Sequence, residues 1–96
     1  MRLDKFLQAV GIVKQRTRAK ALCERGSVRV DGQVAKAARP VRAGHKVQVR
    51  LGEKLLTYNV LNVPERVVPR AARGEYVELI GTQSLDVAPD LGSDLT

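Results

Sequence analysis

The sequence predicts an α+β domain, in which two N-terminal helices pack on one face of a small curved antiparallel sheet of four to five strands. Apolar residues recur at helical spacing over the first 25 positions, and the pattern then changes to the alternation typical of strands. Turn residues separate the alternating stretches. We expect residues 1–80 to form this domain. Residues 81–96 carry three Asp and no basic residue, which predicts a disordered acidic tail.

The first helix is predicted from Leu3, Phe6, Leu7 and Val10, because the spacing i, i+3, i+4, i+7 places them on one face. Gly11 ends this helix.

The second helix is predicted over about residues 15–25, and Gly26 is its C-cap. Its buried stripe consists of small and apolar residues, and two pairs of cations flank this stripe on opposite sides. A single flat ligand therefore does not reach both pairs, which are Arg16 with Lys20 and Arg18 with Arg25.

The strands begin after Gly26. Residues 27–35 are typical of a hairpin, and Asp31-Gly32 suits a type I′ turn, in which both central residues need positive φ. Residues 46–51 alternate cleanly and predict a strand with its valines facing the core.

Gly52-Glu53 can then turn the chain into a second hairpin, whose return strand covers residues 54–61. A long connection with two prolines and a helical turn near Ala71 leads to a last short strand over residues 76–80.

The positive charge is concentrated in the first half of the chain. The net charge is +7, yet residues 1–54 hold 14 Lys and Arg against four Asp and Glu, and residues 55–96 hold three against six. Such an asymmetric field attracts polyanions. Nucleic acid fits better than an anionic membrane, because neither basic helix has a wide, bulky apolar face. Only three aromatic residues are present, and Phe6, the one in the basic half, belongs to the apolar face of the first helix, which argues against base stacking and so against a reader of single strands.

The composition argues against several other classes. A single cysteine, Cys23, excludes an internal disulfide and a multi-cysteine metal site, and it suits a small buried position. His45, beside Gly44, is expected to be a turn residue. We predict no catalytic residues, no metal and no cofactor, and therefore no enzyme. Since no signal peptide or long apolar run is present, we expect a cytoplasmic protein without membrane contact, and a monomer.

The first half of the chain resembles the S-four RNA-binding domain, also called the alpha-L motif. The resemblance covers roughly residues 2–51. It is carried by Arg2-Leu3-Asp4, Leu7, Gly11, Arg16, Ala19 and the stretch Gly26-Ser27-Val28-Arg29-Val30-Asp31-Gly32. Further positions, among them Ala35-Lys36, Gly44, Val49-Arg50 and Lys54-Leu55, are similar to the short stand-alone members, which are a ribosome-associated heat-shock protein and its relative in ribosome quality control.

The resemblance implies a function on stalled ribosomes. Members of this group bind large-subunit rRNA and the tRNA of an obstructed peptidyl-tRNA, and they assist the addition of C-terminal tails to the stalled chain. The implied partners are therefore rRNA and tRNA on the large ribosomal subunit, and a tail-adding quality-control factor. The order Lys14-Gln15-Arg16-Thr17 is most similar to the quality-control member.

Cations held on a rigid face can bind the phosphates of double-helical RNA, whose base edges are hidden in a deep groove. Arginine suits this role because its planar fork can hold one phosphate with two hydrogen bonds. Asp4 either orients Arg2 or Arg16 or is a plain first-turn acid that favours the helix dipole. For Arg66, Arg70 and Arg73, contact with RNA and a solvated loop are equally expected. The predicted RNA-binding residues are Arg2, Lys5, Lys14, Arg16, Lys20, Lys36 and Arg39.

Two alternatives to a stand-alone factor remain at this point. The domain could be a detached RNA-binding module that aids an rRNA- or tRNA-modifying enzyme. It could also be a helix-turn-helix regulator of DNA, since two basic helices joined by a short turn can imitate that motif.

Overall fold

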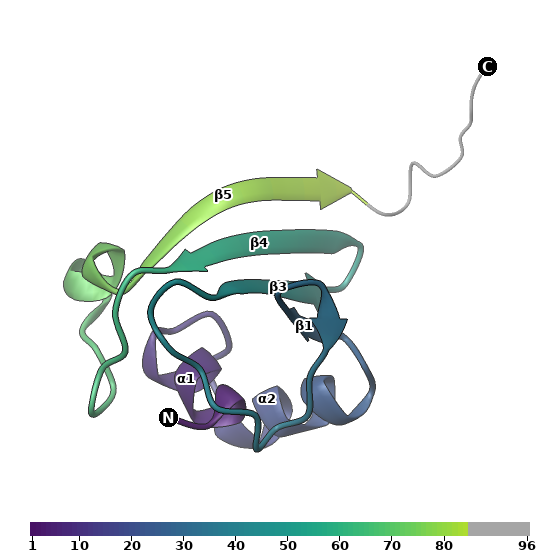
Figure 1. Cartoon of the computed structure of the whole chain (residues 1–96), viewed down its shortest axis with the longest axis horizontal. Coiled ribbons are helices and arrows are strands. Elements are labelled where there is room, and N and C mark those ends of the chain that lie inside the picture. The colour runs from purple at the N-terminus through teal and green to yellow at the C-terminus, as the bar shows by residue number, and fades with distance from the viewer. Residues whose placement is uncertain (85–96) are drawn as a thin grey trace.

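A computed structural model describes residues 1–84 of the chain. All five strands form a single antiparallel sheet in the order β2-β1-β3-β4-β5, and both helices lie on one face of it (Figure 1). This arrangement confirms the predicted fold. In chain order, the elements are α1 (Leu3–Ala9), α2 (Arg16–Glu24), β1 (Val28–Val30), β2 (Gln33–Val34), β3 (Lys46–Leu51), β4 (Lys54–Val60), the 3₁₀ helix η1 (Arg70–Glu75) and β5 (Val77–Ser84).

The core lies between the helices and the inner face of the sheet. Alternation places the valines of β1 and β3 on this face, and α1 covers them with Leu3, Phe6 and Leu7, all of which are fully buried. Burying each such side chain stabilises the fold by roughly 1.5–3 kcal/mol. The burial of Leu3, Phe6 and Leu7 thus confirms the predicted helix face. Leu51, at the end of β3, is only half-buried.

The first hairpin turns as predicted. Asp31 and Gly32 have φ values of 51° and 84°, which a type I′ turn requires. The Asp31 carboxylate also accepts a hydrogen bond of 2.8 Å from the backbone N–H of Lys46. This hydrogen bond joins the turn to the start of β3, so Asp31 both forms the turn and links it to a strand fifteen residues later.

Strand β5 is longer than the sequence indicated. It continues to Ser84, four residues beyond the predicted domain boundary at residue 80, so the prediction of a disordered tail was wrong for residues 81–84. The cause is pairing with β4, in which Leu56 and Leu55 lie opposite Thr82 and Gln83. A register shift between Thr57 and Tyr58 marks a bulge, which bends and twists the strand pair. The remainder of the predicted tail, 85–96, lies outside the described residues.

Ending the chain after Ile80 should therefore destabilise the domain. This truncation removes the pairing of residues 81–84 with β4, and we expect a loss of about 2 kcal/mol in the free energy of unfolding. Urea unfolding checks this value. A chain ending at Ser84 is the matched control, because it keeps the whole β4–β5 ladder. Equal stability of the two truncated chains would restore the boundary at residue 80.

The long connection between β4 and β5 is attached to the helical layer. The backbone N–H of Val68 donates a 2.8 Å hydrogen bond to the carbonyl of Ala9 at the end of α1, where helical carbonyls lack partners. The predicted helical turn near Ala71 is present as η1. None of the helices within residues 1–84 is long and apolar enough to cross a membrane.

Candidate nucleic-acid interface

Asp4 is the one buried charged side chain within residues 1–84, with 1% of its surface exposed. Its carboxylate accepts hydrogen bonds from Nε and Nη2 of Arg2, at 3.1 and 3.3 Å, and from the backbone N–H of Lys5 at 2.8 Å. Nε of Arg16 lies 3.5 Å from Oδ2 of the same carboxylate, the oxygen that also accepts from Nη2 of Arg2. Asp4 therefore forms ion pairs with both arginines, as the first of its two expected roles requires, and it also lies in the first turn of α1, as the second does.

Both arginines remain available to a ligand. Their side chains are 48% and 49% exposed, although Asp4 holds one edge of each. One carboxylate balances only one of the two positive charges, so the cluster keeps a net charge of +1. A bidentate contact also limits the rotamers of Arg2, which lowers the entropy lost when it binds a phosphate. We call Arg2, Asp4 and Arg16 the Asp4 cluster.

The loop of residues 36–41 brings two more predicted cations to this cluster. The first N–H groups of α1 have no helical partner, and here the loop supplies the acceptors. Leu3 and Asp4 donate to the carbonyls of Arg39 and Ala37, at 2.8 and 3.1 Å. Arg2 also forms a bridge with Pro40. Lys36 and Arg39 are thereby held beside the start of α1.

Lys5 and Lys20 extend the positive surface from the same two helices. Lys5 follows Asp4 directly and is exposed. Lys20 lies one helical turn after Arg16 and is also exposed, so the two side chains share one side of α2. The structure therefore places six of the seven predicted RNA-binding residues on or directly beside α1, α2 and the adjoining loop.

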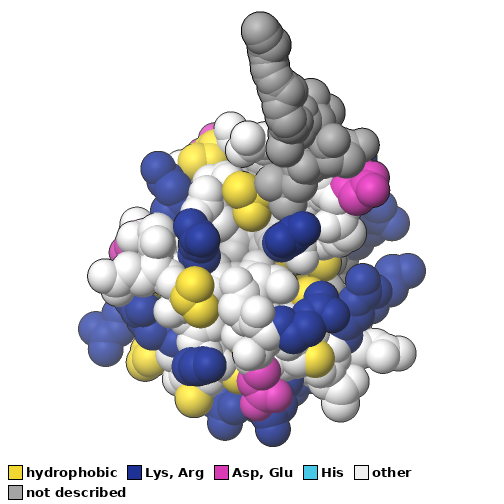
Figure 2. All heavy atoms as spheres, turned by 90° about the vertical axis from the view of Figure 1, so that its right-hand side faces the viewer, with side chains coloured by type: hydrophobic (Ala, Val, Ile, Leu, Met, Phe, Trp, Pro, Cys, Tyr) yellow, Lys and Arg dark blue, Asp and Glu magenta, His cyan; other side chains and the backbone are white. Residues whose placement is uncertain are grey.

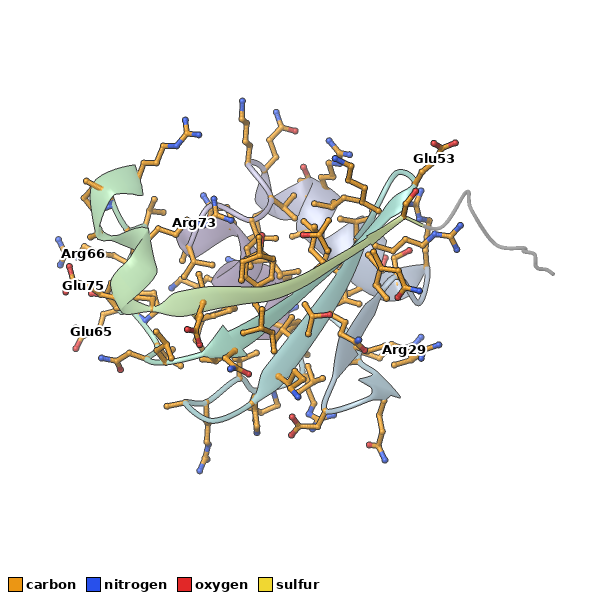
Figure 3. The ribbon with its side chains drawn as sticks, turned by 90° about the horizontal axis from the view of Figure 1, so that it is seen from above. Arg29, Glu53, Glu65, Arg66, Arg73 and Glu75 are labelled. Carbon is orange, nitrogen blue, oxygen red and sulfur yellow. The ribbon has the colours of Figure 1, made fainter. Side chains whose placement is uncertain are left out.

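Lys14 lies in a different neighbourhood. Together with Val10, Gly11 and Val68 it lines a hollow of about 300 Å³ that Arg70 and Arg73 also line. Arg73, labelled in Figure 3, is fixed there. Its Nη2 donates to the Tyr58 hydroxyl at 3.1 Å, and its guanidinium lies 5.8 Å from the centroid of that ring.

Arg70 and Arg73 are thus candidate site residues that the sequence left as an equal choice. The loop is anchored by η1 and by the Val68–Ala9 hydrogen bond, rather than freely solvated. The sequence did contain a signal that Arg70 and Arg73 act together, because they are three residues apart. This is the period of a 3₁₀ helix, so both side chains lie on the same side of it. Their shared hollow with Lys14 could not be predicted, because it is lined by segments more than fifty residues apart in the sequence.

Cys23 and His45 have structural positions, as predicted. Cys23 is buried, and burial raises the pKa of its thiol to about 11, with a further contribution from the charge of Asp4. At neutral pH the thiol is protonated and a poor nucleophile. His45 accepts a 3.1 Å hydrogen bond at Nδ1 from the backbone N–H of Arg42 within a turn.

The first 47 residues match the family model of the S4 domain. A protein of Halalkalibacterium halodurans named RQC P-site tRNA stabilizing factor is 48% identical over 67 residues, which are 70% of this chain and 76% of that protein. A protein of the same name from Streptococcus pneumoniae is 37% identical over 76 residues, or 79% of this chain and 86% of the relative.

The chain belongs to the S4-domain family of RQC P-site tRNA stabilizing factors.

A solved structure supports the same fold. The trimeric structure of Vibrio cholerae Heat Shock Protein 15 superposes with a TM-score of 0.78 and 26% sequence identity, and the match covers 83% of this chain and 81% of that one. Within this S4 family member, all seven predicted RNA-binding residues and Asp4 fall inside the region of the domain model. Arg70 and Arg73 lie beyond it.

Proposed function

We propose that the protein is an RNA-binding factor of ribosome quality control, which holds peptidyl-tRNA on an obstructed large ribosomal subunit. One structural observation carries this proposal: a buried carboxylate positions two half-exposed arginines on a rigid two-helix face. The names of the relatives, which describe stabilisation of P-site tRNA, supply the specific target. Of the alternatives from the sequence, a DNA regulator and a detached enzyme module have no comparable support.

The arrangement suits a positioning role. Phosphate contacts fix the orientation of a nucleic acid without reading its sequence. Arg2 and Arg16, held by Asp4, would grip the backbone of one RNA helix, with Lys5, Lys20, Lys36 and Arg39 adding electrostatic attraction around them. The target RNA would thereby be held in one geometry while another factor extends the stalled chain.

The partners we propose follow from this role. They are rRNA and tRNA on the large subunit, and a tail-adding factor that acts on the same complex. Because the protein acts as a positioner, it needs no catalytic group of its own. Its location is that of the ribosome, in the cytoplasm. We propose a monomer, and sedimentation equilibrium tests this against the trimer described for the Vibrio cholerae relative.

Binding should be electrostatic and should prefer duplex RNA to duplex DNA of the same length and sequence. The fixed arginines suit the A-form backbone, and the basic half of the chain offers no aromatic platform for single strands. Fluorescence anisotropy at several salt concentrations provides the measurement. The logarithm of the affinity should fall by about 0.7–0.9 per phosphate contact for each tenfold rise in salt. Equal affinity for both duplexes at every salt concentration would contradict the proposal.

A further inference from the structure

Three arginines that the Asp4 cluster does not use surround a second hollow at the end of α2. It has a volume of about 300 Å³, and no acidic side chain lines it. We call it the arginine hollow. Its lining residues are Arg25, Gly26, Ser27, Arg29, Gln48, Arg50 and Leu55.

The sheet register places the arginine hollow on the outer face of the sheet. Arg29 of β1 lies opposite Gln48 of β3, and Arg50 follows Gln48 by two residues, so both arginines are on the same face. This is the outer face, since the valines of β1 and β3 are buried in the core. The backbone N–H of Arg50 donates to the carbonyl of Ser27 at 2.9 Å, which holds the end of α2, with Arg25 at its C-cap, beside β3.

The three guanidinium groups of the hollow are unpaired within the part of the chain that the structure describes. No ion pair or side-chain hydrogen bond is formed by Arg25, Arg29 or Arg50 among residues 1–84. The Asp4 cluster differs in this respect, because a carboxylate already balances part of its charge. Three like charges around one hollow repel each other, and carboxylates that enter it relieve the repulsion and accept their hydrogen bonds.

The end of β5 lies in line with this hollow. Leu55 of β4 pairs with Arg50 on one side and with Gln83 of β5 on the other, so the three residues form one row across the outer face. Neighbouring strands are about 4.8 Å apart, which puts the backbone of β5 about 10 Å from that of β3 in this row. The segment that follows Ser84 therefore starts only two strands away from Arg50.

Residues 85–96 carry the opposite charge to the hollow. The segment contains Asp86, Asp90 and Asp94 and no basic residue, so its carboxylates equal the three guanidinium groups in number. An extended chain spans at most about 3.5 Å per residue, so the six residues from Ser84 to Asp90 reach up to about 20 Å. This span exceeds the distance of two strands, and Asp90 and Asp94 can therefore both reach the arginines.

The hollow and the end of β5 share one end of the molecule. Arg29 extends from β1 at the right-hand end of Figure 3, away from Arg66 at the opposite end. Strand β5 ends on the right of Figure 1. Figure 2 shows the molecule from that side, where most of the charged side chains in view are dark blue Lys and Arg. The acidic segment thus begins beside a predominantly positive surface.

We propose that residues 85–96 fold back onto the arginine hollow of the same molecule and cover its three arginines. Exposed ion pairs are individually weak and are screened by salt. This occupant is tethered, however, which gives it an effective concentration in the millimolar range. The contact therefore forms at low salt, and another polyanion must displace the segment before it reaches the hollow. The inference goes beyond the proposed function, because it does not require RNA as the ligand of the Asp4 cluster.

Paramagnetic NMR on the full chain tests the proposal. A nitroxide is attached at Ser93→Cys, and Cys23 stays unlabelled because it is buried. At low salt, the amide signals of residues 26–29 and 48–50 should lose most of their intensity, whereas those of residues 65–68 should keep theirs. Full intensity around the hollow, or equal loss in both regions, would overturn the proposal.

Two sets of substitutions separate a contact at the hollow from the closeness of the end of β5. Each should restore most of the lost intensity. The first set, which leaves residues 1–84 intact, is Asp86→Asn with Asp90→Asn and Asp94→Asn. The second set is Arg29→Gln with Arg50→Gln. Signal loss that persists in the first set would contradict the proposal whether or not the second variant folds.

The matched control for the second set is Arg42→Gln with Arg66→Gln. It removes the same charge from other exposed positions, and it should restore no intensity. Melting temperatures establish that both arginine variants fold. If the control restores as much intensity as the test variant, the segment responds to net charge and not to the hollow, and the proposal fails.

A mixture of two chains tests whether the contact lies within one molecule. The spin-labelled chain is prepared without isotope and is mixed with an isotope-labelled chain that carries no nitroxide. We expect no loss of signal in this mixture. Loss around the hollow would assign it to the acidic segment of a second copy and would overturn the intramolecular contact.

Elution from heparin, a sulfated polyanion, provides a second readout. The three Asp→Asn substitutions should raise the salt concentration needed for elution more in the wild-type background than in the background of Arg29→Gln with Arg50→Gln. The reason is that only the first background has a complete hollow to uncover, so the two sets of substitutions are not additive. An equal rise in both backgrounds would show that the aspartates act through net charge alone, which contradicts the proposal.

Discussion

Replacing Arg2 and Arg16 together with alanine should release the protein from stalled large ribosomal subunits. Each substitution removes a charge-assisted contact worth about 1.5–3 kcal/mol, so the affinity for RNA should fall roughly 100-fold or more. Both side chains lie outside the core, but within residues 1–84 their loss leaves the buried Asp4 carboxylate with only the Lys5 N–H as a partner. The variant should therefore lose stability, and its melting temperature must establish that it is folded under the assay conditions. Co-sedimentation with stalled subunits, together with tail addition to the stalled chain, provides the readout. A variant that stays bound and active would show that the two-helix face is not the RNA site.

The substitution Asp4→Asn separates orientation from charge. It raises the net charge by one, so a site that works by bulk attraction alone should bind RNA more tightly. Asp4 instead fixes Arg2 and Arg16 by ion pairs of 3.1 and 3.5 Å, and an amide holds two guanidinium groups less firmly. We therefore expect weaker binding despite the added charge. Tighter binding would reduce Asp4 to a helix-terminal acid.

The substitution Phe6→Ala should remove much of the stability of the domain. Phe6 is the largest fully buried side chain, and such a truncation costs about 3–5 kcal/mol through lost burial and the cavity that remains. A chain of this size has a total stability of only about 5–15 kcal/mol. Thermal and urea unfolding should show a large drop, and RNA binding should weaken at temperatures where the variant unfolds.

Leu79→Ala is the control for this prediction. Leu79 is 53% exposed on β5, so its truncation should change the free energy of unfolding by only about 0.5 kcal/mol. If both variants unfold at the same temperature, the contacts of Phe6 contribute less than its burial indicates.

The helices and the first hairpin could be predicted because each is specified by residues within its own segment. The helical spacing of Leu3, Phe6 and Leu7 matches their burial, and Asp31-Gly32 has the positive φ values that its turn type requires. Strand β5 was underestimated for the opposite reason. Most of its side chains are exposed, so it has no alternation to detect, and its pairing with β4 extends it to Ser84.

The candidate site was predictable only in part. The seven cations were named from charge and resemblance, but the contacts that arrange them join distant segments. The burial of Asp4 depends on the loop of residues 36–41, and the position of Arg73 depends on Tyr58. The arginine hollow was missed because Arg29 and Arg50 look like ordinary outward strand residues until the register sets β1 beside β3.

The link between α1 and the loop of residues 36–41 has a consequence for synthesis of the protein. The N–H groups of Leu3 and Asp4 find their acceptors in that loop, so the start of α1, which carries Arg2 and Asp4, is not fully held until the loop is present. A nascent chain must expose its first 41 residues before this surface exists. The growing polypeptide therefore lacks this surface until about half of the described domain has been exposed.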